Sequence, residues 1–201
     1  MKKALFLGRA LTLAVVIAAI VSKTALASTT PVDTSACGNP LLTQPFLSAG
    51  DQNYYTLVAG QTPGNFDATG WTLTGGAKLV STKLADGTTG SVLDLPSGSK
   101  ALSPTTCVTS DFPTARMMVK NVVGTDSVFF YVGYAGTSTW TTPKNTGQVH
   151  GTGTAWTLSS AVNLQPSSAA GWQLVRFTLV PGGKTSDFQV YNFYVDPRLK
   201  W

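Results

Sequence analysis

The chain has 201 residues and a formal net charge of +5, from 14 Lys and Arg against nine acidic residues. All nine acids are Asp, so a catalytic mechanism that requires a glutamate is excluded. Four of the bases lie within the first 27 residues, and the remaining ten nearly balance the nine acids, which gives no support for nucleic acid as a partner.

The first 27 residues have the layout of a signal peptide. Basic residues open the segment, an apolar run covers 11–21, and Ala25-Leu26-Ala27 places small residues at the first and third positions of a cleavage site. The apolar run is shorter than the roughly 20 residues that cross a bilayer, which argues against a membrane anchor. We therefore predict removal of residues 1–27, a mature chain that begins at Ser28, an extracellular location, and no membrane partner after cleavage.

The chain has two cysteines, Cys37 and Cys107. In an exported protein an even count favours a disulfide, because nothing outside the cell keeps thiols reduced, and a pair of free buried thiols is the alternative. Together with the single histidine, His150, these groups are too few for a structural zinc site, and we expect no metal centre. We predict an N-terminal extension over 28–44 that carries Cys37, followed by one domain over 45–201.

Short alternating segments separated by Gly, Pro, Asn and Asp follow one another along the mature chain, a pattern typical of β-strands. The strands predicted, in chain order, are Tyr54–Val58, Trp71–Thr74, Ala77–Thr82, Ser91–Leu95, Thr114–Asn121, Ser127–Tyr134, Thr154–Leu158, Gln173–Val180 and Asp187–Asp196. The absence of Glu and the abundance of Thr, Ser, Gly and Val argue against long helices. The pattern predicts an all-β fold, a jelly-roll β-sandwich of two antiparallel sheets preceded by a cleavable N-terminal signal helix.

Two segments resemble a known family. Residues 64–73 (Gly-Asn-Phe-Asp-Ala-Thr-Gly-Trp-Thr-Leu) look like the opening of the galactose-binding-like jelly rolls that serve as carbohydrate-binding modules, and residues 188–196 look like their last strand. Residues 103–108 and 195–198 are similar to segments of uncharacterised secreted bacterial proteins. The family resemblance implies a β-sandwich whose partner is a carbohydrate or a cell-surface polymer.

The last strand of such modules usually carries adjacent acids that help to hold a structural calcium. Here Tyr191 and Asn192 occupy that place, and Asp67 is the remaining candidate ligand. A calcium ion requires about six to eight oxygen ligands, and the sequence does not supply that set. We expect no cofactor, with a structural calcium left open and a turn or capping role as the alternative for Asp67.

Strand alternation suggests where a ligand could bind. We expect Arg116, Tyr131 and Arg176 on an outer sheet face, and Trp140 in the polar loop 136–143 beside them. A pyranose ring can lie on an aromatic ring while its hydroxyls or a carboxylate accept hydrogen bonds from arginine. These four residues are the predicted ligand-binding site, with ordinary surface ion pairs and core packing as the alternative. The other strand tryptophans, Trp71, Trp156 and Trp172, are expected in the core.

The function predicted is therefore non-catalytic binding of a glycan or cell-surface polysaccharide by a secreted monomer, with no catalytic residues. One alternative is a polysaccharide lyase for a uronic-acid polymer, because Gln148-Val149-His150 is similar to the Gln-x-His of alginate-lyase-like jelly rolls. That family also needs a Glu-containing strand, which this chain lacks. A second alternative is a structural envelope protein without a small ligand.

Overall fold

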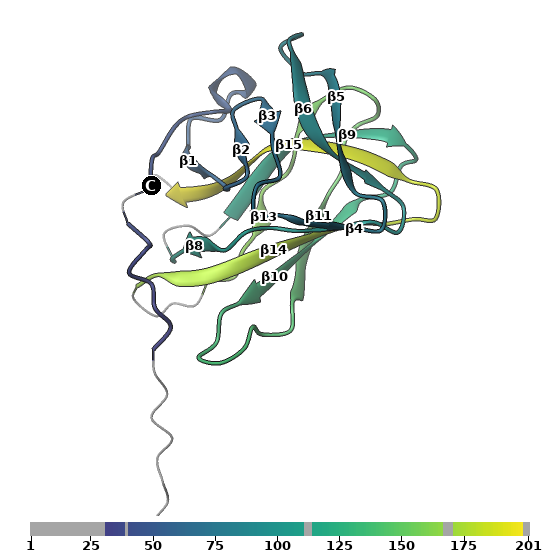
Figure 1. The fold of residues 1–201 in the computed structure, drawn as a ribbon. Coiled ribbons are helices and arrows are strands. Elements are labelled where there is room, and N and C mark those ends of the chain that lie inside the picture. The colour runs from purple at the N-terminus through teal and green to yellow at the C-terminus, as the bar shows by residue number, and fades with distance from the viewer. Residues whose placement is uncertain (1–30, 39, 111–113, 167–170, 199–201) are drawn as a thin grey trace, which may run out of the picture.

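A computed structural model describes residues 31–38, 40–110, 114–166 and 171–198. Within these residues the chain forms a sandwich of two antiparallel sheets, drawn one above the other in Figure 1. The predicted all-β class is confirmed. The expected signal peptide and Ser28 lie outside the described residues, and in the described part of the chain no helix is long and apolar enough to cross a membrane.

The upper sheet in Figure 1 has seven strands, with β15 at its centre. Its main path is β12 (Thr157–Leu158), β9 (Thr114–Val123), β15 (Asp187–Arg198), β6 (Thr89–Pro96) and β5 (Lys78–Lys83). Two short strands complete it, β1 (Tyr54–Leu57) beside β15 and β13 (Val162–Asn163) beside β9.

The lower sheet has six strands and is built around β14. Its main path is β11 (Lys144–Val149), β10 (Val128–Tyr134), β14 (Gln173–Pro181), β7 (Lys100–Leu102) and β4 (Thr72–Thr74), with β8 (Thr106–Val108) also paired to β14. A separate hairpin pairs β2 (Gln61–Thr62) with β3 (Asn65–Phe66), and a 3-10 turn, η1 (Leu47–Ala49), precedes β1.

The hydrophobic core lies between the two sheets. In β9, β10 and β14 every second side chain is buried, as the sequence alternation predicted. Phe193 of β15 contacts the opposite sheet, with its ring centroid 5.5 Å from that of Phe130 and 5.1 Å from that of Phe177. Each such ring contributes about 2–3 kcal/mol by leaving water, which makes this aromatic contact a main link between the sheets.

Eight of the nine predicted strands match strands with small differences at their ends, while only the last two residues of Thr154–Leu158 are extended. Trp156 is not in the core between the sheets but packs against a smaller hydrophobic cluster of Leu84, Val92 and Tyr191 on the outer face of the seven-stranded sheet. Its indole N–H donates to the carbonyl of Lys83 at 2.7 Å, and its ring meets Tyr191 edge-on at 4.6 Å. Trp71 is in the core, and Trp172 packs against it.

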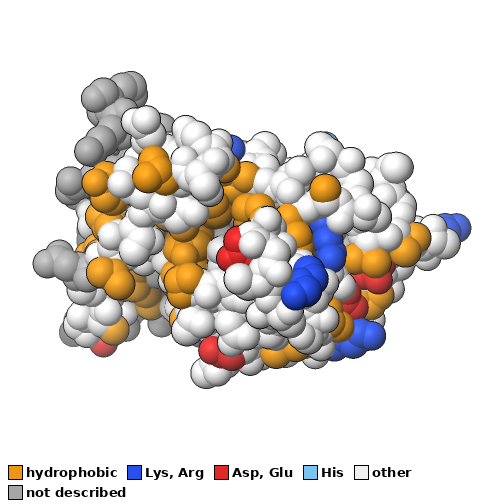
Figure 2. Space-filling view, turned by 90° about the horizontal axis from the view of Figure 1, so that it is seen from above, with side chains coloured by type: hydrophobic (Ala, Val, Ile, Leu, Met, Phe, Trp, Pro, Cys, Tyr) orange, Lys and Arg blue, Asp and Glu red, His pale blue; other side chains and the backbone are white. Residues whose placement is uncertain are grey.

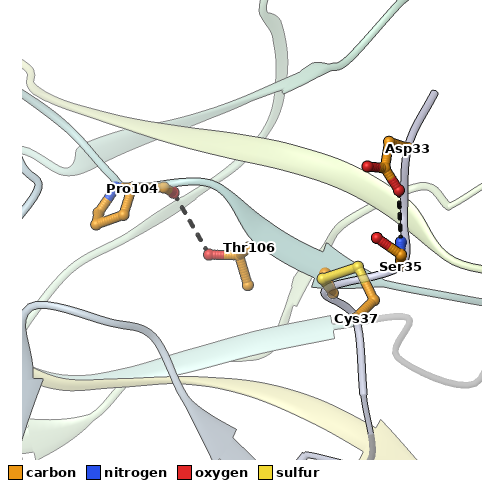
Figure 3. The surroundings of a disulfide bond; sticks show 6 residues. Asp33, Ser35, Cys37, Pro104 and Thr106 are labelled. Carbon is orange, nitrogen blue, oxygen red and sulfur yellow. Dashed lines mark hydrogen bonds between the residues drawn. A yellow bond between two sulfur atoms is a disulfide. The ribbon is translucent and has the colours of Figure 1, made fainter.

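The predicted disulfide between Cys37 and Cys107 is present, with Cα atoms 5.7 Å apart (Figure 3). It attaches the N-terminal extension to β8 of the six-stranded sheet. Six residues later Thr43 pairs with Tyr55 of β1, which belongs to the seven-stranded sheet. The extension is therefore fastened to both sheets.

Candidate functional site

The outer face of the six-stranded sheet carries a cation–aromatic contact. Arg176 lies in β14 between the buried Val175 and Phe177, so its side chain points away from the core. Its guanidinium carbon is 4.2 Å from the centroid of the Trp140 ring. Such a contact is worth about 0.5–2 kcal/mol, enough to hold the two groups together at a surface.

A tight turn presents Trp140 to this arginine. The N–H of Gly136 donates to the carbonyl of Thr139 at 2.8 Å, and Trp140 pairs with Ala135 across the turn. The N–H of Thr141 then donates to the carbonyl of Tyr134 at 2.8 Å. These bonds extend β10 into a hairpin and leave the indole half-buried.

Tyr131 lies on the neighbouring strand of the same outer face. In the β10–β14 pairing, Tyr131 is opposite Thr178 and Gly133 is opposite Arg176. The side chains of Tyr131 and Arg176 are therefore diagonal neighbours on the same face of the sheet. Tyr131 is half-buried, between the buried Phe130 and Val132. We call Trp140, Arg176 and Tyr131 the Trp140 platform.

The structure does not bring Arg116 to this platform, so the expectation of one groove lined by all four residues is wrong. Arg116 lies in β9, on the outer face of the seven-stranded sheet. Its Nε donates to the carbonyl of Ser159 at 3.0 Å, and its Nη1 forms an ion pair with Asp51. Alternation identifies the face of a strand but not the sheet that the strand joins, and this caused the error.

The residues of the lyase alternative do not converge with the platform. His150 is exposed and follows β11, whose last residue Val149 is opposite Val128 at one end of β10. Arg176 is opposite Gly133, five residues further along β10, or about 16 Å away. Burial raises the pKa of Tyr134 to about 12, so this phenol is protonated at neutral pH and is not available as an ionised base. A single sugar residue could not contact both His150 and Arg176.

Sequence reasoning missed a groove on the other side of the molecule. A cavity of about 720 Å³ lies over the outer face of the seven-stranded sheet, between η1, the β2–β3 turn and the β5–β6 turn. Figure 2 looks down on this face and shows hydrophobic side chains along a hollow, with both acidic and basic side chains nearby. The sequence signals were Pro63-Gly64-Asn65 and Asp86-Gly87, which mark turns but do not indicate that the two turns face each other.

Among the described residues, no group of three or more His, Cys, Asp or Glu side chains is placed to hold a metal ion. The carboxylate of Asp67 accepts the N–H of Thr69 at 2.6 Å, the geometry of an Asx turn. Hydrogen bonds from the side chain and the backbone N–H of Thr69 hold the pKa of Asp67 below its usual value.

No family model and no curated protein sequence matches the chain. Several solved structures are similar, among them an arabinose-bound GH51 α-L-arabinofuranosidase with 18% identity and a TM-score of 0.45. The match covers 72% of this chain but only 27% of that enzyme. The CBM22-1 xylan-binding domain of Xyn10C from Paenibacillus barcinonensis is 14% identical over 70% of this chain and 90% of that domain, with a TM-score of 0.42. A family 11 carbohydrate-binding module from Clostridium thermocellum, in complex with a mixed-linked tetrasaccharide, is 12% identical over 66% and 91% of the two chains, with a TM-score of 0.38.

Fold and surface thus define an all-β sandwich whose structural neighbours include carbohydrate-binding modules. At identities of 18% or lower, this similarity concerns the fold alone.

Proposed function

We propose that the protein is a secreted, non-catalytic glycan-binding domain that holds an acidic polysaccharide on the Trp140 platform. The observation that carries the proposal is the guanidinium of Arg176 held 4.2 Å from the Trp140 ring on an open sheet face. The disulfide fits an oxidising compartment such as the cell exterior.

The chemistry of the platform suits a uronic-acid residue. The C–H face of a pyranose packs on an aromatic ring, and both Trp140 and Tyr131 are half-buried at this surface. A sugar carboxylate would accept charge-assisted hydrogen bonds from the planar fork of Arg176. Arg176 is already oriented, since it lies against the indole and its Nε donates to Thr105 Oγ1 at 3.4 Å. Little side-chain entropy would be lost on binding.

The test is retention of the chain 28–201 in gels that contain polygalacturonate, compared with gels without polymer. We expect Trp140→Ala to weaken retention by at least about 1 kcal/mol, roughly fivefold, with little change in melting temperature. Thr137→Ala is the matched control, because Thr137 is exposed in the same turn. Arg176→Met keeps most of the aliphatic part of the side chain but removes the guanidinium. It should therefore reduce retention by polygalacturonate more than retention by a neutral polymer.

Unchanged retention of the Trp140→Ala variant would contradict the proposed site. Release of unsaturated uronic ends from polygalacturonate would favour the lyase alternative instead. If the protein binds no polysaccharide and captures only other proteins, the envelope alternative is favoured.

A further inference from the structure

The groove over the seven-stranded sheet has three walls, and each is fastened to the body of the domain. Phe46, before η1, packs against Tyr55 and Tyr194 with ring centroids 5.1 Å and 5.4 Å away. The β2–β3 turn is held by Gly64, whose N–H donates to the side-chain oxygen of Asn192 at 2.7 Å. The β5–β6 turn is held by Ala85, whose N–H donates to the Tyr191 hydroxyl at 3.2 Å. Because packing and hydrogen bonds hold all three walls in place, the groove is preorganised for a ligand.

An irregularity in the central strand shapes the floor. The pairing of β15 with β9 shifts between Tyr191 and Tyr194, and Asn192 has a left-handed backbone with φ of 50°. This bulge places both tyrosines on the outer face and directs Asn192 to the groove. The Asn192 oxygen is occupied by Gly64, which leaves its amide nitrogen as the group that can donate to a ligand. Bulges and left-handed non-glycine residues are concentrated at binding sites.

Close packing of two turns makes the groove narrow on one side. A Cβ at Gly90 of β6 would meet the carbonyl oxygen of Gly64 at 2.1 Å, so only glycine permits this approach. The apolar surface nearby comes from Leu84, Met118 and Pro63, and hydroxyl groups come from Thr88, Thr89 and Ser48. The cavity volume of about 720 Å³ is within the range of about 300–1,000 Å³ typical of small-molecule sites.

The charge at the groove differs from that at the Trp140 platform. Asp86 is the only charged residue among the described residues that line it. Hydrogen bonds from the Thr88 side chain and backbone lower the pKa of Asp86, so it is a carboxylate at neutral pH. The bases that flank Met118 in β9 are engaged elsewhere, Arg116 with Asp51 and Lys120 with Thr82 at 3.2 Å. The described lining of the groove therefore carries one negative charge and no positive charge, the opposite of the Trp140 platform with its Arg176.

We propose that this groove is a second saccharide site, which binds a neutral oligosaccharide on the face opposite the Trp140 platform. The Asp86 carboxylate accepts hydroxyl hydrogens, the amides of Asn65 and Asn192 donate to ring or hydroxyl oxygens, and Met118 with Leu84 covers the apolar face of a sugar ring. This proposal concerns a different surface and does not depend on acidic-glycan binding at the platform.

A peptide is a weaker match to this groove. Extended peptides often bind by pairing with a free sheet edge. The strands under the groove, β6 and β15, are interior strands with a neighbouring strand on each side, so they have no free edge. The groove therefore offers side-chain hydroxyl, amide and carboxylate groups in place of a backbone ladder. A hydroxyl-rich, uncharged ligand uses these groups best.

The test measures retention of the chain 28–201 in gels that contain neutral mixed-linked β-glucan, xylan or galactan, with polygalacturonate as the acidic comparison. Asp86→Asn should lower retention by the best neutral polymer at least fivefold. The asparagine oxygen can still accept the hydrogen bonds from Thr88, but the negative charge that accepts the sugar hydroxyl hydrogens is lost. Asp67→Asn is the matched control, since Asp67 makes the same turn contact with Thr69 outside the groove. Ser48→Trp should block the groove, whereas Leu47→Trp, on the same turn but not in the lining, should not.

The proposal is overturned if the wild-type chain is retained by none of the three neutral polymers, or if Asp86→Asn and Ser48→Trp are retained as strongly as their controls. Retention by polygalacturonate should be unchanged in both variants. Loss of acidic retention in Trp140→Ala together with normal neutral retention would separate the two sites. Melting temperatures of all variants exclude unfolding as the cause.

Discussion

Asp51 shows how one carboxylate organises the residues around it. Burial of its side chain, which is 7% exposed, acts to raise its pKa. Hydrogen bonds from Tyr55, the Asn53 N–H and Arg116 outweigh this effect, so the pKa lies below the usual value. A carboxyl group with a lowered pKa in the folded state stabilises the fold above its unfolded pKa of about 4, and this contribution is lost as the pH falls through the folded pKa.

We expect Asp51→Asn to lower the free energy of unfolding at pH 7 by about 2 kcal/mol, because the partly exposed Arg116 then loses its charge partner. The variant should also lose less stability than the wild type when the pH is lowered from about 5 to 2. Urea unfolding at several pH values measures both effects. Asp126→Asn removes the same charge from an exposed loop and serves as the control. An equal pH dependence in the two variants would contradict the role of Asp51.

At the scale of elements, alternation predicted the long strands because each has one buried and one outer face. β9, β10 and β14 follow the pattern almost from end to end. The edge strand β11 (Lys-Asn-Thr-Gly-Gln-Val) was missed because only its last residue, Val149, is buried, which leaves no periodic signal. The strands β2, β3, β7, β8 and β13 were missed because each has only two or three residues, too few for a periodic pattern.

The candidate sites were predictable only in part. Trp140, Tyr131 and Arg176 could be named because strand alternation puts Tyr131 and Arg176 at outer positions, and large aromatic side chains at such positions are informative. Pairing between strands far apart in sequence decides which of them meet, and it placed Arg116 on the other sheet. The groove depends on the bulge at Asn192 and on the approach of Gly64 to Gly90, and neither feature follows from local periodicity.

The disulfide gives a test at this scale, because it fastens the N-terminal extension to β8. Replacing Cys37 and Cys107 together by Ser should lower the free energy of unfolding by about 4 kcal/mol in the chain-entropy model, for a sequence separation of 70 residues. The β-sheet circular dichroism spectrum should persist, since the core between the sheets is large enough to fold alone. Denaturant unfolding of the wild type and the double variant measures the difference.

An unchanged unfolding midpoint would contradict a stabilising disulfide. Loss of the β-sheet spectrum would show that the core does not suffice without it. The single variants are poorer tests, because each leaves one free thiol that can form intermolecular disulfides.

At the scale of the whole molecule, we expect export with removal of residues 1–27. Mass spectrometry of protein recovered from the culture medium should give a chain that starts at Ser28 and takes up no alkylating reagent without reduction, because both thiols are bonded. After reduction two alkyl groups should be added. A retained leader, or alkylation of the unreduced protein, would contradict the secretory prediction.

The same disulfide determines how the domain responds to mechanical force. Tension applied at the two ends of the chain passes from Cys37 through the sulfur bridge to Cys107, so the segment between the two cysteines cannot be extended while the bridge is intact. The segment between the two cysteines would measure about 240 Å when fully extended. Force on the two ends of the oxidised domain can therefore lengthen it only through the residues outside the bridge, and reduction would release the rest.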